Sequence, residues 1–160
     1  MDLEGCSDIF CRAFFNSDVD MQTDTHWRCS NGEGSFNYRL ILPLKSDENN
    51  FKLQIEAWDK DVVARDDLIG SCSFDLEPMF KDCQLTGRQM YLTKSYFESY
   101  LQAQLVNNGD HTAHEVEWED EDRFWLPIRR FISEQDMYVS AGEILVSVNL
   151  LPKELALKNP

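Results

Sequence analysis

Apolar and polar residues alternate along several short stretches of the chain. The clearest alternation covers residues 51–57, where Phe51, Leu53, Ile55 and Ala57 are separated by polar side chains. A period of two is typical of a strand with one buried face. Similar patterns or short apolar runs predict further strands over residues 7–15, 23–29, 36–44, 68–76, 123–128 and 142–151. Short strands separated by polar turns predict an all-β, antiparallel sandwich.

One region has the spacing of a helix instead. Apolar side chains recur three or four residues apart between residues 92 and 105, at Leu92, Tyr96, Phe97, Tyr100, Leu101 and Leu105. Ser95 followed by Glu98 has the spacing of a capping box, in which each side chain bonds a free backbone N–H at the start of a helix. The pattern predicts a helix over residues 95–106, inserted between strands.

Composition and charge narrow the class of protein. The chain has 160 residues, 42% of them hydrophobic, which suits one domain with its own core. It contains no run of 18 apolar residues that would span a membrane and no signal peptide is visible. Its five cysteines form no C-x-x-C pair, which favours reduced thiols in a cytosolic protein. A net charge of −14 opposes binding to nucleic acid, and also to anionic lipid unless the local charge changes.

Two acidic windows have the residue types that bind a hard cation. Calcium prefers six to eight oxygen ligands, largely carboxylates and carbonyls. Asp2 and Asp8 belong to one window, and Asp59, Asp61 and Asp67 belong to the other. An EF-hand also begins with D-x-D, but it requires glycine at loop position six and glutamate at position twelve. Ala64 and Gly70 occupy those positions here, which excludes that motif.

The sequences around these acids resemble a known family. The phrase GCSDIFCRAF resembles the G-x-S-D-P/I-Y-V signature of C2 domains, and AWDKDVVARDDLIG resembles their third calcium loop. The resemblance implies a C2-type β-sandwich of about eight strands. It also implies a Ca²⁺ site whose ligands are Asp2, Asp8, Asp59, Asp61 and Asp67. C2 domains have a strand before the first calcium loop, and this chain begins inside that loop. Asp2 is therefore expected on a frayed terminus.

A finer resemblance is to the last, membrane-proximal C2 domain of ferlins. The stretches QTDTHWRCSNGEGSFNYRLILPL and AGEILVSVNLLP carry it, and the similarity covers residues 2–80 and 124–152. Residues 1–160 are then expected to form a single C2 domain, with residues 81–122 as a helical and acidic insertion. Ferlins are tail-anchored proteins that act in calcium-triggered membrane fusion and repair. The resemblance implies a place on the cytoplasmic face of membranes, with an anchor beyond Pro160.

Two functional hypotheses follow. In the first, the chain is a calcium-dependent module that binds anionic phospholipid membranes, and Leu3, Val62 and Val63 insert into the bilayer. Val62 and Val63 have an alternative role, in which they pack beneath their own loop. In the second hypothesis, the insertion recruits proteins and calcium plays little part. No motif of catalytic residues is visible, so the sequence predicts no enzyme.

Three further features of the sequence are weak indications of function. His111 and His114 lack the additional ligands of a zinc site. The segment from Glu115 to Asp122 holds six acids in eight residues, and a contiguous run of like charge is typical of a solvated loop. Arg129-Arg130 is too short to form a nucleic-acid patch.

Overall fold

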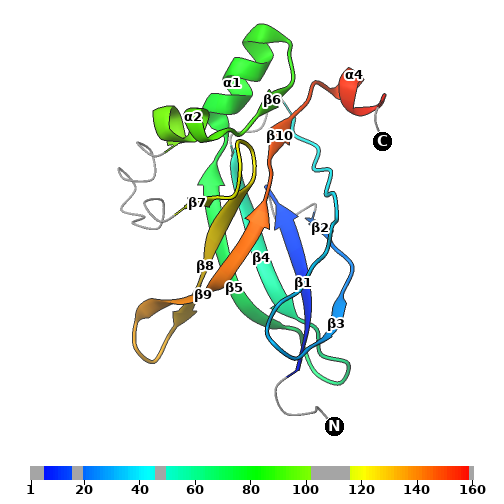
Figure 1. Ribbon diagram of the computed structural model, residues 1–160, viewed down its shortest axis with the longest axis vertical. Coiled ribbons are helices and arrows are strands. Elements are labelled where there is room, and N and C mark those ends of the chain that lie inside the picture. The colour runs from blue at the N-terminus through cyan, green and yellow to red at the C-terminus, as the bar shows by residue number, and fades with distance from the viewer. Residues whose placement is uncertain (1–5, 16–19, 46–49, 102–115, 159–160) are drawn as a thin grey trace. The chain divides into compact units, whose positions relative to one another are not determined.

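The computed structural model describes residues 6–15, 20–45, 50–101 and 116–158 of the chain. The residues divide into two compact units. The first comprises Met1–Ser73 and Ile128–Gly142, and the second comprises Phe74–Pro127 and Glu143–Pro160. Strands dominate the elements and helices are short (Figure 1). The all-β, antiparallel fold expected from the sequence is therefore confirmed.

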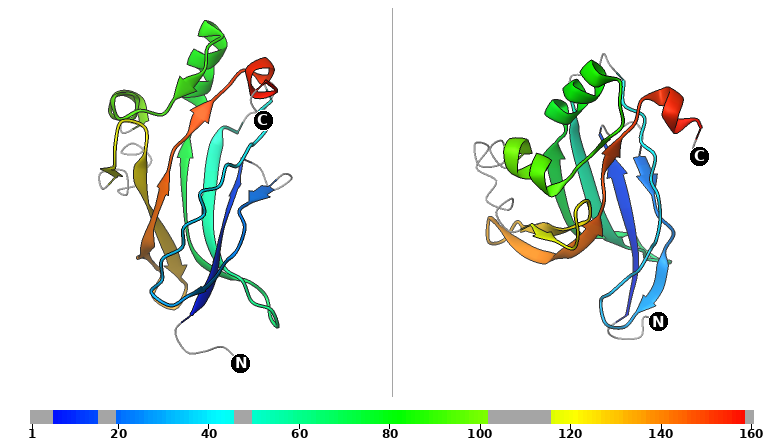
Figure 2. Two further views of the ribbon diagram at one scale, coloured as in Figure 1. Left: turned by 45° about the vertical axis from the view of Figure 1, so that its right-hand side comes forward. Right: turned by 45° about the horizontal axis from the view of Figure 1, so that its top comes forward.

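The first unit is built on a sheet. Its strands are β1 (Ser7–Phe14), β2 (Asp20–Gln22), β3 (His26–Cys29), β4 (Lys52–Asp59), β5 (Asp67–Asp75), β8 (Phe124–Ile132) and β9 (Met137–Val146). The order is β2-β1-β4-β5-β8, with β3 also paired to β1 and β9 paired to β8. Strands β5, β8 and β9 continue into the second unit. Both views of Figure 2 show β1 (blue) and β4 (cyan) side by side, in agreement with their antiparallel pairing from Ile9↔Asp59 to Phe14↔Gln54.

Strand β4 follows the predicted alternation. Leu53, Ile55 and Ala57 are buried, as a strand with one face in the core requires. Glu56 is also buried, and both of its carboxylate oxygens have partners. The Gln54 side-chain amide donates to Oε1 at 2.8 Å, and the Trp58 indole N–H donates to Oε2 at 2.8 Å. These bonds offset the cost of removing a carboxylate from water.

Cys11 on β1 is buried, and burial raises the pKa of its thiol from 9.0 to about 11. Desolvation disfavours the thiolate, so the folded state holds this proton more tightly than the unfolded chain does. The protonated Cys11 thiol therefore contributes fully to the stability of the folded state below pH 9, and this contribution is lost as the pH rises toward 11. We expect Cys11 to resist iodoacetamide at pH 9 in the folded chain and to react in urea, as measured by peptide mass spectrometry. Modification of Cys11 at equal rates in both conditions would contradict this burial.

The strand predicted over residues 36–44 is wrong. The segment has no strand assignment, although its alternation persists: Leu40 and Leu42 are half-buried, and Ile41 between them is exposed. A strand also requires a neighbouring backbone to pair with, and Pro43 has no N–H to donate. Within the described residues, no segment pairs with this one. The alternation correctly indicates that Leu40 and Leu42 face inward, but Tyr38, which it also places inward, is 49% exposed. It does not supply a pairing partner.

The second unit combines helices with short strands. Its complete elements are α1 (Glu77–Thr86), β6 (Met90–Tyr91), α2 (Lys94–Tyr96), η1 (Phe97–Leu101), β7 (Glu117–Trp118), β10 (Asn149–Leu150) and α4 (Lys153–Ala156). Strand β7 pairs with the start of β8, and β10 pairs with β6. The fully buried side chains of this unit are Leu76, Met79, Leu92 and Phe124. Among the helices in the described part of the chain, none combines the length and apolarity needed to cross a bilayer.

The predicted helix lies in this unit with a different start. Helix α2 begins at Lys94 and continues as the π-helix η1 to Leu101, while residues 102–106 lie outside the described residues. Thr93 is the N-cap: its hydroxyl accepts from the backbone N–H of Tyr96 at 3.3 Å. The expected capping box at Ser95 is therefore wrong. Thr93 has the extended backbone that an N-cap adopts, and Ser95 is already inside the helix.

Candidate functional site

The start of β1 and the end of β4 bring two of the predicted calcium ligands together. The backbone N–H of Asp8 donates to Oδ1 of Asp59 at 2.8 Å. The backbone N–H of Lys60 returns a bond to the Asp8 carbonyl at 2.8 Å. Antiparallel pairing of Ile9 with Asp59 fixes this arrangement. Asp8 and Asp59 are thus neighbours at one end of the sheet, although they are 51 positions apart in the sequence.

The Asp8 side chain also has a structural role. Its Oδ1 accepts from the backbone N–H of Arg28 at 2.7 Å. Arg28 has a φ of 61°, a left-handed conformation that residues other than glycine seldom adopt. The register between β1 and β3 shifts between Ser7 and Ile9, directly at Asp8. The Asp8 carboxylate therefore holds an irregular point of the β1–β3 pairing in place.

Asp61 organises the loop that follows β4. Its Oδ1 accepts from the backbone N–H groups of Val63 at 2.8 Å and Ala64 at 3.1 Å. The Val63 bond first, and then the Ala64 bond, hold the pKa of the Asp61 carboxyl below its usual value of 3.8. The bonded form is the carboxylate, which keeps its charge to lower pH. In turn, the Asp61 N–H donates to Oδ1 of Asp66 at 3.1 Å.

This folded loop leaves two valines in solvent. Val62 is 80% exposed and Val63 is 91% exposed, so neither packs beneath the loop. Figure 1 shows the loop projecting beyond the ends of β4 and β5. Isolated exposed valines need no explanation, but two adjacent ones at the tip of a loop form an apolar contact point.

A cavity of about 400 Å³ adjoins Asp59 and Asp67. Asp59 is at the end of β4 and Asp67 is at the start of β5, so the two strands bring their carboxylates to one space. The remaining lining comes from β5, β8 and β9: Leu68, Ile69, Arg130, Val139, Ser140 and Ala141. No pattern in the sequence singles out Arg130 or Ser140, because only the pairing of β8 with β5 and β9 brings them to this cavity.

The acids suit calcium as individual donors, but they do not form a compact cluster. No group of three His, Cys, Asp or Glu side chains able to hold a metal occurs among the described residues. Asp8, Asp59 and Asp61 each use Oδ1 for backbone bonds, and in the described part of the chain Oδ2 of each accepts no hydrogen bond. These are carboxylate oxygens of the type that calcium prefers. Asp2 and Leu3 lie outside the described residues.

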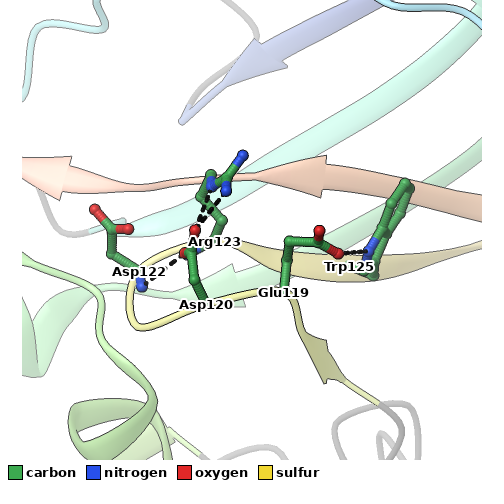
Figure 3. A network of polar contacts seen from close by, with 5 residues as sticks. All are labelled: Glu119, Asp120, Asp122, Arg123 and Trp125. Carbon is green, nitrogen blue, oxygen red and sulfur yellow. Dashed lines mark hydrogen bonds and ion pairs between the residues drawn. The ribbon is translucent and has the colours of Figure 1, made fainter.

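The acidic run of residues 115–122 has a different structure. From Val116 onward it is described, and it forms strand β7 and the turn between β7 and β8 (Figure 3). Asp120 Oδ2 accepts from Arg123 Nε at 2.7 Å, and a bond to the Arg123 side chain is the main reason that the pKa of Asp120 is lowered. The Trp125 indole donates to Glu119 at 3.2 Å. Exposed acids in a bonded turn agree with the solvated loop expected from the sequence. The two histidines set aside as zinc ligands, His111 and His114, lie outside the described residues.

Comparison with known proteins gives the family. Myoferlin of Xenopus tropicalis is 29% identical over 97 residues, an alignment that covers 46% of this chain and 5% of that protein. Human myoferlin is 28% identical over 97 residues with the same coverage. The sperm vesicle fusion protein fer-1 of Caenorhabditis elegans is 32% identical over 95 residues, again covering 46% of this chain and 5% of that protein. The chain spans about 5% of the length of these curated relatives.

The family model of the C2 domain matches residues 1–91, which include β1, β4 and the start of β5 where Asp8, Asp59 and Asp67 are positioned. This match covers more than half of the chain. The antiparallel sheet and the similarity to ferlins agree with this family match. The chain therefore belongs to the C2 domain family.

Proposed function

We propose that this chain is a calcium-dependent module that binds anionic phospholipid membranes. One observation carries the proposal: Asp8 at the start of β1 adjoins Asp59 at the end of β4, beside a loop that exposes two valines. The proposed ligands are Asp8, Asp59, Asp61 and Asp67, together with Asp2. Among the described residues, the proposed calcium ligands and the exposed valines then occupy the same end of the first unit.

Charge explains why such a site would respond to calcium. The chain carries a net charge of −14, which repels an anionic bilayer. Two bound Ca²⁺ ions would add about +4 to the five proposed carboxylates, and so bring the local charge close to neutral. The bonds that already order Asp8, Asp59 and Asp61 leave one oxygen of each for a cation. Calcium binding would thus act as an electrostatic switch and require no large rearrangement.

Calorimetry of the purified chain with calcium, after dialysis against chelator, tests the proposal directly. We expect saturable heat with a dissociation constant in the micromolar-to-millimolar range of calcium-sensing and extracellular modules. Sedimentation with vesicles of phosphatidylserine and phosphatidylcholine should then require calcium. A folded chain that gives no heat, or that sediments equally well in chelator, would overturn the proposal.

The exposed valines supply a second test. We expect Val62→Ser/Val63→Ser to weaken calcium-dependent vesicle binding by at least about tenfold, because burying each valine in lipid contributes about 1.5–3 kcal/mol. Calcium affinity without lipid should not change, since the carboxylates remain. Leu85→Ser is the matched control: Leu85 is 85% exposed but lies on α1 in the second unit. Equal losses in the two variants would contradict a specific role for this loop.

The wider process follows from the relatives. One of them is named a sperm vesicle fusion protein. We propose that the chain belongs to a ferlin-like, tail-anchored protein and acts at the cytoplasmic face of membranes during fusion, trafficking or repair. Domains of this family are generally binding modules, which favours membrane recruitment over catalysis.

A second candidate is calcium-independent binding of a protein through the insertion. The ordered, exposed acids of the β7–β8 turn favour it, since Glu119 and Asp120 are held by Trp125 and Arg123. A preordered acidic surface suits a basic partner. Binding of a basic peptide that is unaffected by chelator and lost on Glu119→Gln/Asp120→Asn would favour this candidate. Failure of either condition would exclude it.

A further inference from the structure

The cavity beside the proposed calcium ligands also contains a cation. Arg130 lines it together with Asp59 and Asp67. Arg130 forms no ion pair within 4.0 Å with any carboxylate of the described residues, although two acids share its cavity. An arginine in such a place retains all its hydrogen-bond donors for another ligand.

Strand geometry explains why Arg130 faces this cavity. Along β8, Phe124, Leu126 and Ile128 are buried, while the residues between them are more exposed. Because side chains alternate along a strand, Arg130 is on the same face as Ile128, one step beyond the last buried position. Arg129 is on the opposite face, and its Cα is paired with Ser71 of β5. Arg130 is therefore an exposed cation on the face of β8 whose earlier residues are buried.

Gly70 allows the strands to approach closely at this point. A Cβ atom at Gly70 would lie 2.8 Å from the Cβ of Ala141 and 3.2 Å from the carbonyl oxygen of Arg129. Such contacts are shorter than van der Waals packing allows, so a side chain at this position would push β5 away from β8 and β9. The close approach brings Asp67 on β5, Arg130 on β8 and Ser140 on β9 to one cavity.

The mixture of charges indicates the class of ligand. A Ca²⁺ ion at Asp59 and Asp67 would neutralise these two carboxylates, because it adds about two positive charges. The cavity lining would then carry the single positive charge of Arg130, which favours an anion. A guanidinium group binds phosphate through two parallel hydrogen bonds, and the Ser140 hydroxyl is a further donor. The cavity, of about 400 Å³, is open to solvent, so a group at a membrane surface can enter it.

We infer that Arg130 and Ser140 bind the phosphate of a membrane phospholipid whose headgroup also contacts calcium at Asp59 and Asp67. This inference rests on the proposed function and deepens it, because it assigns lipid recognition to β8 and β9 as well as to the calcium loops. A free phosphodiester has the same chemistry. The membrane is favoured as its source, because the same end of the unit exposes Val62 and Val63.

The test compares Arg130→Gln with Arg129→Gln, which removes the same charge one residue away on the opposite face of β8. Calorimetry with calcium alone should show equal or slightly tighter binding for Arg130→Gln, because a repelling charge has left the cavity. Sedimentation with phosphatidylserine–phosphatidylcholine vesicles in calcium should be weakened about tenfold or more for Arg130→Gln. Arg129→Gln should change it by less than about twofold. Circular dichroism confirms that both variants are folded.

The outcomes separate the inference from the proposed function. If wild-type chain binds neither calcium nor vesicles, the proposed function fails and the phosphate site fails with it. If wild-type chain binds both but the two arginine variants behave alike, only the phosphate site is overturned. If soluble glycerophosphoserine binds the calcium-loaded chain as tightly as vesicles do, the ligand is a free phosphodiester and the membrane assignment is overturned.

Discussion

Replacing Asp59 and Asp61 together by asparagine is expected to abolish calcium-dependent binding of this chain to anionic vesicles. Asp59 touches both parts of the proposed site: it bonds Asp8 and it lines the cavity with Asp67. Asp61 begins the loop that exposes the two valines. Removing two carboxylates lowers both the number and the charge of the calcium ligands. We expect calcium affinity to fall on the order of 100-fold or more.

The fold should survive this double substitution. The amide oxygen of an asparagine accepts the same backbone bonds that Oδ1 of Asp59 takes from Asp8 and that Oδ1 of Asp61 takes from Val63. Loss of binding would then report on the metal ligands and not on unfolding. Circular dichroism and urea denaturation establish this point independently of calcium.

The matched control is Glu121→Gln/Asp122→Asn. These two acids belong to the β7–β8 turn in the second unit, and their substitution changes the net charge by the same amount. Calorimetry and vesicle sedimentation should give wild-type values for this variant. Calcium-dependent binding that persists in Asp59→Asn/Asp61→Asn, or that is lost equally in the control, would show that these aspartates are not the ligands.

The strands were predictable where the pattern and the pairing agree. Over residues 51–57 the alternation is regular, and β4 has a neighbour on each side, so Leu53, Ile55 and Ala57 are buried as expected. Residues 36–44 have an equally regular alternation but no pairing partner among the described residues. Periodicity is a local property, whereas a strand is defined by a second backbone that can be distant in the sequence.

Helix α1 was missed although local signals were present. Pro78 is in its first turn, and Gly87 ends it with a φ of 63°. Proline at the start and glycine at the end are typical of helix boundaries. Its apolar positions are sparse, however, and only Met79 and Cys83 are buried. Reading hydrophobic spacing alone therefore fails on a helix whose boundaries give the clearer signal.

Some residues of the candidate site were also predictable from the sequence, and others were not. Asp8, Asp59, Asp61 and Asp67 were identified from their spacing, and their roles as ligands stay a prediction. Arg130 could not be identified as a site residue from the sequence, because two adjacent arginines are a weak signal. Its position depends on strand alternation in β8, on the pairing of Arg129 with Ser71, and on the space left by Gly70. Only three-dimensional contacts place it beside the carboxylates.

Phe124→Ala is expected to cause the largest loss of stability from a single substitution. The Phe124 side chain is completely buried in the second unit. Its ring centroid lies 4.9 Å from that of Trp118 and 6.2 Å from that of Phe97. Truncation removes the buried ring and leaves a cavity that its neighbours fill only in part. We expect the free energy of unfolding, measured by urea denaturation, to fall by about 3–5 kcal/mol.

Phe131→Ala is the appropriate control for that measurement, because Phe131 is on the same strand but is 47% exposed. Its ring touches only Tyr138 among the described aromatic side chains, at 5.1 Å between centroids. The loss there should be below about 1.5 kcal/mol, as expected for one aromatic pair at the surface. Similar losses at both positions would contradict a core centred on Phe124.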